Sequence, residues 1–452
     1  MRRGKTYPRA LGVFNEGLAA LGWPAILILF AALLIGGGGS RYGLLNLTIQ
    51  LLALALLCWF NTEARASMRS LGVGLLALVA ATIALPLLQL VPLPPDIWQA
   101  LPGREIAFES RDIVGAADQW FPMTLDRGRT LVAFASLVPA VAIILLVRKS
   151  GSRNGFAQAG LRLLVLFALL NLLLGGFQIA TRGLSPLPYP ILDASRSYGF
   201  FASHNTSGLF SVIGLCALAG VRFSDRGVVS PRTAKLVLAS ILAIATILTQ
   251  SRSSTALLIL PLAYLVFLAL RDSKVSMSRK LVVQAVLGLG AILLTVGYLT
   301  AETRLAATLE RFEDLEDARP DIWQDGLVSA ERFFPVGAGM GAFDEVFQLD
   351  ESLETISPSF ARRAHNEYIE IAVEAGIFGL AIVSAWLIWG SLSWYRALGV
   401  NRSKEGAAAG LALVCIALQS FVDYPLRNQT LLCVAALLVA ILARPIVQKR
   451  VR

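Results

Sequence analysis

Charged residues, histidine, cysteine and lysine are all scarce in this chain of 452 residues. Charged side chains make up only 15% of it, whereas soluble domains carry about 25%. Hydrophobic residues make up 56%, and the mean hydropathy is positive. This composition excludes an ordinary soluble fold and indicates a membrane protein.

The scarce metal-binding residues are not grouped. The four cysteines all stand in apolar runs, where we expect small buried side chains rather than disulfides or metal ligands. They are Cys58, Cys216, Cys415 and Cys433. The acidic run at 313–317 is the one stretch that resembles a divalent-ion site, and a solvated helix face explains it more simply. We therefore expect neither a metal nor a cofactor.

Apolar runs of about 17–22 residues recur along the chain, the length that crosses a bilayer core. They predict an all-α, polytopic transmembrane helical bundle of about twelve spans. Basic residues precede the first run, and no clear cleavage site follows it, so we expect a retained first helix. The predicted spans lie at 20–36, 44–60, 71–90, 129–147, 160–180, 204–221, 236–250, 254–270, 281–300, 366–392, 406–422 and 430–443.

The basic residues are distributed unequally between the two sides of this predicted bundle. All seven lysines fall on one side, together with 18 arginines and only five acids. The other side carries 15 arginines, no lysine and 25 acids. By the positive-inside rule the lysine-rich side is cytoplasmic, as are both termini. The net charge of +10 thus reports orientation and contact with anionic membrane lipids, and with no nucleic-acid motif present we expect no nucleic-acid partner.

The connections divide the chain into three parts. Residues 1–300 hold the first nine spans and an outer loop near 91–128, and residues 366–452 hold the last three spans. Between them, 301–365 form a large outer loop, a length typical of a functional lid or binding element. We expect two helices in it. One is amphipathic, with Leu305, Leu309, Phe312 and Leu315 on one face, and the other begins at Pro320.

His365 stands in RRAHNEYIEIAVEAGIFGL, at the predicted outer start of the tenth span. The helix N-terminus and the neighbouring Arg362 and Arg363 favour a neutral imidazole, which suits a general base near neutral pH. A helix-start hydrogen bonder at the membrane interface is the alternative. For His204, the other histidine, we favour a structural role.

Arginine supplies all the positive charge on the outer side, although it outnumbers lysine throughout the chain. Its rigid fork suits phosphate. Arg252, in LTQSRSSTALLIL, falls at membrane depth, where a charge is a candidate functional group. Arg319, in EDLEDARPDIWQDGL, and Arg363 are further candidates, with an ion pair or headgroup anchor as the alternatives. Arg196, in ASRSYGFFASHN, is a weaker one.

Glu370 and Glu374 lie one and two turns inside the tenth span. An acid at that depth requires a cationic partner, and we expect Glu374 to pair with Arg252. The nearby glycines of PVGAGMGAF, Gly337, Gly339 and Gly341, resemble a phosphate-binding loop, but no strand–loop–helix pattern or Walker lysine accompanies them.

A base and several arginines facing the outer side, without ATP, favour group transfer from a donor that carries its own activation. A lipid-linked diphosphate fits, because arginines would stabilise the departing diphosphate while His365 deprotonates an acceptor hydroxyl. A transporter or flippase of polyprenyl-linked glycans is the alternative from another class. It would need charged residues along the middle of its spans, whereas the informative charges here cluster at the outer face.

Several of these motifs occur in an order that resembles the O-antigen ligase/O-antigen polymerase superfamily of bacterial envelope glycosyltransferases. The motifs, in chain order, are the SR of TQSRSS, the arginine that precedes the tryptophan in ARPDIWQDGL, the segment FFPVGAGMGAF and the segment HNEYIEIAVEAGIFGL. They span about 250–380. YGFFASHNTSGLF, which holds Asn205, is similar to the family's aromatic–Asn segment before a span.

The resemblance implies an inverting, metal-independent transfer of a glycan from an undecaprenyl-diphosphate carrier to a lipid or glycan acceptor, at the periplasmic face of the bacterial inner membrane. It implies that Arg252 and Arg319 are the diphosphate-binding arginines and His365 the base, with Arg304 and Arg311 as alternatives to Arg319. Arg363, Arg196, Asn205 and Glu374 are further candidates for substrate binding. Ligase and polymerase both remain open.

Overall fold

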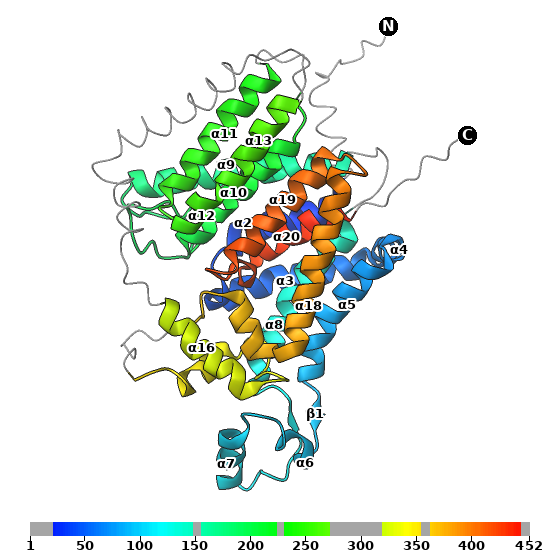
Figure 1. Cartoon of the computed structure of the whole chain (residues 1–452), viewed down its shortest axis with the longest axis vertical. Helices are drawn as coiled ribbons and strands as arrows, with labels where there is room; N and C mark the ends of the chain where they lie inside the picture. The colour runs from blue at the N-terminus through cyan, green and yellow to red at the C-terminus, as the bar shows by residue number, and fades with distance from the viewer. Residues whose placement is uncertain (1–20, 148–154, 224–229, 272–318, 354–361, 444–452) are drawn as a thin grey trace.

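The structure, a computed structural model, describes residues 21–147, 155–223, 230–271, 319–353 and 362–443. These ranges are mostly helical (Figure 1). The α-helices are α2 (Trp23–Ile35), α3 (Gly43–Trp59), α4 (Asn61–Ser70), α5 (Val73–Gln89), α6 (Pro95–Trp98), α7 (Glu105–Ile113), α8 (Arg127–Leu146), α9 (Gly155–Ala180), α10 (His204–Gly220), α11 (Pro231–Leu248), α12 (Arg252–Leu257), α13 (Ile259–Arg271), α16 (Arg319–Phe333), α17 (Phe343–Val346), α18 (Glu367–Leu398), α19 (Lys404–Gln419) and α20 (Gln429–Leu442).

Shorter elements complete the described chain. The 3-10 turns are η1 (Ser40–Tyr42), η3 (Phe347–Leu349) and η4 (Pro425–Arg427). Within the described ranges the only strands are β1 (Pro92–Leu93) and β2 (Phe121–Pro122), which pair antiparallel. The all-α class is thus confirmed.

Apolar helices occupy eleven of the twelve predicted spans. The remaining span, the ninth along the chain at 281–300, lies outside the described residues. Within the described ranges, five helical stretches are long and apolar enough to cross a membrane: α8, α9, α11, α12 with α13, and α18. The bent pair of α3 and α4, with an angle of 86°, would be a sixth. The chain is therefore a multi-pass membrane protein, and the count of twelve spans stays a prediction.

The core of the bundle is built around α10 and α20, which are buried along almost their whole length. A helix that is apolar on every side is found in a protein core or in a membrane, and these two are covered by other helices. Glycines on α10 allow a close approach, since a Cβ on Gly214 would lie 2.5 Å from the Cβ of Ala168 in α9. At Gly208 the added atom would meet Ser254 at 2.7 Å, so this glycine holds the start of α12 against the start of α10.

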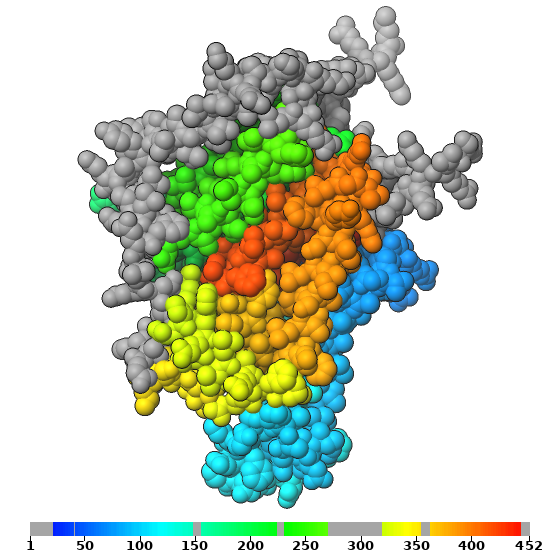
Figure 2. All heavy atoms as spheres, in the orientation of Figure 1, coloured from blue at the N-terminus to red at the C-terminus, as the bar shows by residue number. Residues whose placement is uncertain are grey.

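Two predicted outer segments lie together at one end of the molecule, where β1, α6 and α7 sit below α16 (Figure 1). Arg104 joins them. Its side chain is 1% exposed, and its Nη2 donates to the carbonyls of Met123 (2.6 Å) and Gly337 (2.9 Å). Burial lowers the pKa of Arg104 to about 10. The space-filling view shows residues 319–353 beside the first part of α18 (Figure 2).

A lysine hydrogen bond and an ion pair lie at the C-terminal end of α10. Lys235 of α11 donates to the carbonyl of Ala219 (3.3 Å), and Glu405 of α19 pairs with Arg222 (2.7 Å). Because α10 has 17 residues, this end is about 25 Å from His204. The described lysines therefore lie at the opposite end of α10 from His204, as the charge distribution predicts.

Several smaller predictions can also be compared. The second helix of the large loop begins at Arg319, one residue before the expected Pro320, and is confirmed. Three cysteines are buried as expected, but Cys58 is exposed on α3, so that expectation is wrong for Cys58. The predicted amphipathic helix around Leu305–Leu315 and the acidic run at 313–317 lie outside the described residues, as do Arg304 and Arg311.

Candidate functional site

The predicted base, His365, lies just before α18 in a left-handed backbone conformation (φ 49°). The next residue, Asn366, is the N-cap of the helix, and its side chain accepts from the amides of Tyr368 and Ile369. This capping fixes where α18 begins. The imidazole is half-buried, and its Nδ1 lies 3.7 Å from Oδ1 of Asp423.

Tyr424, directly after Asp423, is the point where several predicted site residues meet. Its ring lies edge-on to the imidazole of His365 at 5.1 Å, and the guanidinium carbon of Arg363 is 5.8 Å from its ring centre. Burial and the charge of Asp423 raise the pKa of Tyr424, while the charges of Arg363 and Arg319 oppose that rise. The charge of Arg319, at the first position of α16, thus contributes to the electrostatic environment of the same phenol.

A second link ties α16 to the segment before α18. The indole Nε1 of Trp323 donates to the carbonyl of Ala364 (2.8 Å). Trp323 is one turn after Arg319, so this bond fixes the start of α16 beside His365. Arg319 and His365 were both predicted from the sequence as site residues, and the structure brings the segments that carry them into one region.

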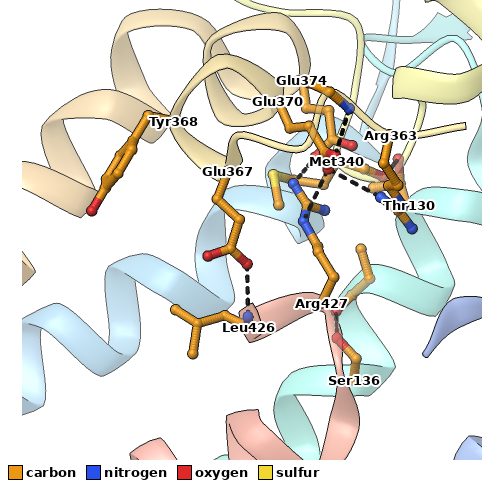
Figure 3. A network of polar contacts seen from close by, with 12 residues as sticks. Thr130, Ser136, Met340, Arg363, Glu367, Tyr368, Glu370, Glu374, Leu426 and Arg427 are labelled. Atoms are coloured by element: carbon orange, nitrogen blue, oxygen red, sulfur yellow. Dashed lines mark hydrogen bonds and ion pairs between the residues drawn. The ribbon is translucent and has the colours of Figure 1, made fainter. Parts of the chain in front are cut away.

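The first turns of α18 carry a buried cluster of carboxylates and arginines (Figure 3). Glu370 and Glu374 of α18 are fully buried. Arg427 Nη2 donates to Glu374 Oε2 (2.6 Å), and its Nε lies 3.5 Å from Glu370 Oε2. Arg363 Nη1 donates to the same Glu370 oxygen (3.1 Å). Burial opposes the charge of Arg427, but the surrounding carboxylates outweigh it and raise the pKa of Arg427.

This cluster corrects one expectation. We expected Arg252 as the cationic partner of Glu374, but Arg427 of η4 holds that position. A charge buried this deeply needs a partner with good geometry, and Arg427 is next to Glu374 because η4 lies between α19 and α20, against the first turns of α18. Glu374 thus serves as an ion-pair partner inside the protein, and its predicted contact with substrate stays a prediction.

The glycine-rich loop 335–341 packs against a break in α18. The helix loses regular geometry at Gly376 (φ 52°, ψ −139°), and the amide of Gly339 donates to the carbonyl of Glu374 (2.8 Å). The amide of Ile377 in turn donates to the carbonyl of Pro335 (3.0 Å). A Cβ on Gly337 would lie 2.5 Å from the backbone of Glu374. These glycines therefore serve close backbone packing.

Arg252 opens α12, and the side chain of Ser251 caps that helix. The next two residues, Ser253 and Ser254, place the N-terminus of α12 between α19 and α10. Ser253 accepts from Gln419 Nε2 of α19 (2.9 Å), and Ser254 donates to the carbonyl of Asn205 in α10 (3.2 Å). Arg252 and Asn205, both predicted for the site, are therefore at neighbouring helix starts.

The start of α18 is joined to the same region through α19. The amide of Glu367 donates to the carbonyl of Ser420 (2.9 Å), the residue after Gln419. Glu367 Oε1 also accepts from the amide of Leu426 (2.8 Å). The N-termini of α10, α12 and α18 thus lie at one end of the bundle, which is a favourable environment for an anion.

Arg196 is engaged within its own loop. Its Nε lies 2.8 Å from Oδ2 of Asp193, and its Nη1 lies 3.1 Å from Nε2 of His204. The hydroxyl of Ser195 is the main cause of the lowered pKa of Asp193, and Arg196 adds to it. This arrangement is consistent with the structural role predicted for His204.

Three residues of this region were missed from the sequence: Asp423, Tyr424 and Arg427. They stand in SFVDYPLRNQ, the short connection between α19 and α20. The available signal was an acid, a tyrosine and an arginine close together between two apolar helices.

One comparison with known proteins gives a match. Residues 236–384 match the model of a family described as O-Antigen ligase. The matched range covers about a third of the chain, from α11 into α18, and includes Arg252, Arg319 and His365. No curated protein matches the chain.

Proposed function

From the match of residues 236–384 to the O-Antigen ligase family, we propose that the chain transfers a glycan from an undecaprenyl-diphosphate carrier to an acceptor hydroxyl. The observation that carries this proposal is that His365, Asp423 and Arg363 lie around Tyr424, with Trp323 holding the start of α16, where Arg319 stands, beside them. It combines a possible base with cations that suit a diphosphate. The residue roles that follow belong to the same proposal.

His365 is the base in this reaction. With Nδ1 turned toward Asp423, the imidazole presents Nε2 to the acceptor hydroxyl. A carboxylate on one ring nitrogen fixes the orientation of the ring and stabilises the imidazolium that forms, as in other acid–histidine pairs. The separation of 3.7 Å is long for a hydrogen bond, and such bonds often tighten only when substrate is bound.

Arg252, Arg319 and Arg363 bind the diphosphate. Two of them stand at or next to helix starts, where the backbone amides add a favourable field for an anion. The guanidinium groups stabilise the negative charge that develops on the leaving diphosphate. Glu374 and Arg427 do not contact the substrate in this proposal. Their ion pair holds the first turns of α18 in place.

The transfer balances without a cofactor. The acceptor oxygen attacks the anomeric carbon and forms the new glycosidic bond while the bond from that carbon to the diphosphate oxygen breaks. The hydroxyl proton passes to His365, and the electron pair of the broken bond leaves with undecaprenyl diphosphate. Attack from the face opposite the leaving group inverts the anomeric carbon, and the arginines supply the positive charge that a metal ion would otherwise give.

We place the protein in the bacterial inner membrane with both termini cytoplasmic and the site facing the periplasm. The lysines at the far end of α10 from His204 support this orientation. In this arrangement the donor carrier stays in the bilayer, while its diphosphate reaches the starts of α12 and α18.

The decisive experiment is reconstitution of the purified full chain with an undecaprenyl-diphosphate-linked glycan and separate acceptors. We expect a product whose mass is that of the acceptor plus one donor glycan, formed equally well after EDTA treatment. A product of donor glycan joined to donor glycan would assign polymerase activity instead. Movement of intact donor between leaflets, without any new glycosidic bond, would overturn the proposal in favour of a flippase.

A further inference from the structure

A cavity of about 410 Å³ lies at a corner of the bundle that the proposed reaction does not use. It is formed where the junction of α4 and α5, the end of α18 and the end of α20 come together. The lining residues combine small, polar and aromatic side chains with one arginine. They are Ser70, Leu71, Gly72, Gly74, Leu75, Trp389, Ser393, Arg396, Asn401, Leu442 and Ala443.

The cavity is far from the candidate active site. Along α18, the 20 residues between the break at Gly376 and Arg396 rise by about 30 Å, the thickness of a bilayer core. Asn401 lies in the turn that leads to Lys404, the first residue of α19. Figure 1 shows α4 at the opposite end of α5 from β1, α6 and α7. The cavity is thus at the lysine-rich end.

Arg396 is the charged group of the cavity. Its side chain is exposed, and in the described part of the chain it forms no ion pair. The hydroxyl of Ser393 supplies a further donor at the cavity, whereas the hydroxyl of Ser70 donates to the carbonyl of Ser67 (2.7 Å). This set is suited to an anion such as a phosphate group, since arginine binds phosphate with a rigid fork.

The surroundings of the cavity suit a lipid rather than a soluble anion. Trp59 is 81% exposed and Tyr395 is 71% exposed, and such side chains are enriched at the boundary between membrane and water. The short helix α4 carries the exposed Arg65 and Arg69 and turns 86° away from α3. An amphipathic basic helix across the end of a membrane span is typical of one that lies in the interface.

We propose that this cavity binds the headgroup of an anionic phospholipid, with Arg396 as the cation on its phosphate and the hydroxyl of Ser393 as a donor. The acyl chains would lie along the exposed apolar face beside Trp389. The anionic lipids of a cytoplasmic leaflet attract basic residues in this position. The site is independent of the proposed glycan transfer.

The test uses the full chain purified in detergent and measures lipid retained after exposure to phosphatidylglycerol or phosphatidylcholine vesicles, by native mass spectrometry. We expect the wild type to retain phosphatidylglycerol in preference. Arg396→Gln should lower that retention about fivefold, the effect of one basic residue near an anionic surface. Because Arg396 is exposed, the unfolding temperature of the lipid-free variant should stay close to that of the wild type.

The matched control is Arg232→Gln, which removes an exposed arginine from the first turn of α11, among the predicted cytoplasmic residues. It should retain lipid as the wild type does. Full retention by Arg396→Gln, or an equal loss in Arg232→Gln, would overturn the proposal. So would inorganic phosphate alone, if it raised the unfolding temperature as much as phosphatidylglycerol does.

Discussion

At the scale of single residues, His365 differs from His204 in what surrounds its ring. The Nδ1 of His365 faces a carboxylate and its ring is half-exposed, whereas Nε2 of His204 is engaged with Arg196. The first arrangement leaves a nitrogen for a substrate, and the second uses that nitrogen within the protein. The two histidines therefore give a matched pair for testing the proposed base.

We predict that His365→Ala lowers the rate of glycan transfer by about 10²- to 10⁴-fold, the usual contribution of a general base. His204→Ala should lower it far less. The measurement is the initial rate in the reconstituted system, with the amount of membrane-inserted protein determined for each variant. Equal losses in the two variants would show that His365 has no special role.

A substitution at Arg252 can separate the need for a positive charge from the need for a planar guanidinium group. Arg252→Lys keeps a cation at the start of α12 but loses the planar fork, so we predict a loss of transfer, mainly as a raised KM for the lipid-linked donor. The measurement is the donor dependence of the rate, with Arg232→Lys as the matched control. Wild-type kinetics in Arg252→Lys would mean that Arg252 is a membrane anchor.

At the scale of elements, η4 and the first half of α18 are held together by an ion pair between distant parts of the sequence. Removing one partner of a buried pair leaves an uncompensated charge and costs about 3–5 kcal/mol. We therefore predict that Arg427→Met sharply lowers the unfolding temperature of the purified protein. The measurement is thermal unfolding in detergent.

The double variant Arg427→Met with Glu374→Gln gives the control for that prediction, because it removes both charges. It should recover a large part of the stability that Arg427→Met loses. If the double variant were less stable than Arg427→Met by the full effect of Glu374→Gln alone, the two side chains would not be coupled.

The break in α18 provides a second test at this scale. At Gly376, φ 52° and ψ −139° lie in a region that is essentially restricted to glycine, and a Cβ would lie 2.0 Å from the carbonyl oxygen of Pro335. We predict that Gly376→Ala destabilises the protein by about 1–3 kcal/mol or more. It should also lower transfer, because the loop and the first half of α18 would separate.

Gly390→Ala is the matched control, since Gly390 lies further along the same helix with open space around the added atom. It should leave stability unchanged or raise it, because alanine is favoured over glycine in a helix. The measurement is again thermal unfolding. A Gly376→Ala protein as stable as Gly390→Ala would contradict the packing of the loop against the break.

The elements differ in how well the sequence predicts them. Helices such as α9 and α10 follow from long apolar runs, because the bilayer requires each crossing to satisfy its own backbone hydrogen bonds. The break at Gly376 does not follow, because the backbone hydrogen-bond partners around it come from the loop at 335–341. The pairing of Glu374 with Arg427 is equally hidden, since it depends on how α18 packs against η4.

At the scale of the whole molecule, charge distribution and fold give the same division into two ends. The Lys235 contact with Ala219 lies at the end of α10, and the Ser254 contact with Asn205 lies at its start. The sequence predicts this division well, because the positive-inside rule acts on composition alone. It could not predict which arginines of the outer end meet, since that requires the packing of four separate helix starts.

The orientation itself can be tested with two exposed positions at opposite ends. We predict that a cysteine at Leu353, beside the outer segments, reacts with a membrane-impermeant maleimide in intact spheroplasts, whereas a cysteine at Val400, in the turn between α18 and α19, does not. Both side chains are highly exposed, and Cys58, the exposed native cysteine, is first replaced by serine. In inverted membrane vesicles the pattern should reverse. Labelling of Val400→Cys in spheroplasts, with Leu353→Cys protected, would place the candidate site in the cytoplasm, where a donor glycan already moved to the periplasm could not reach it.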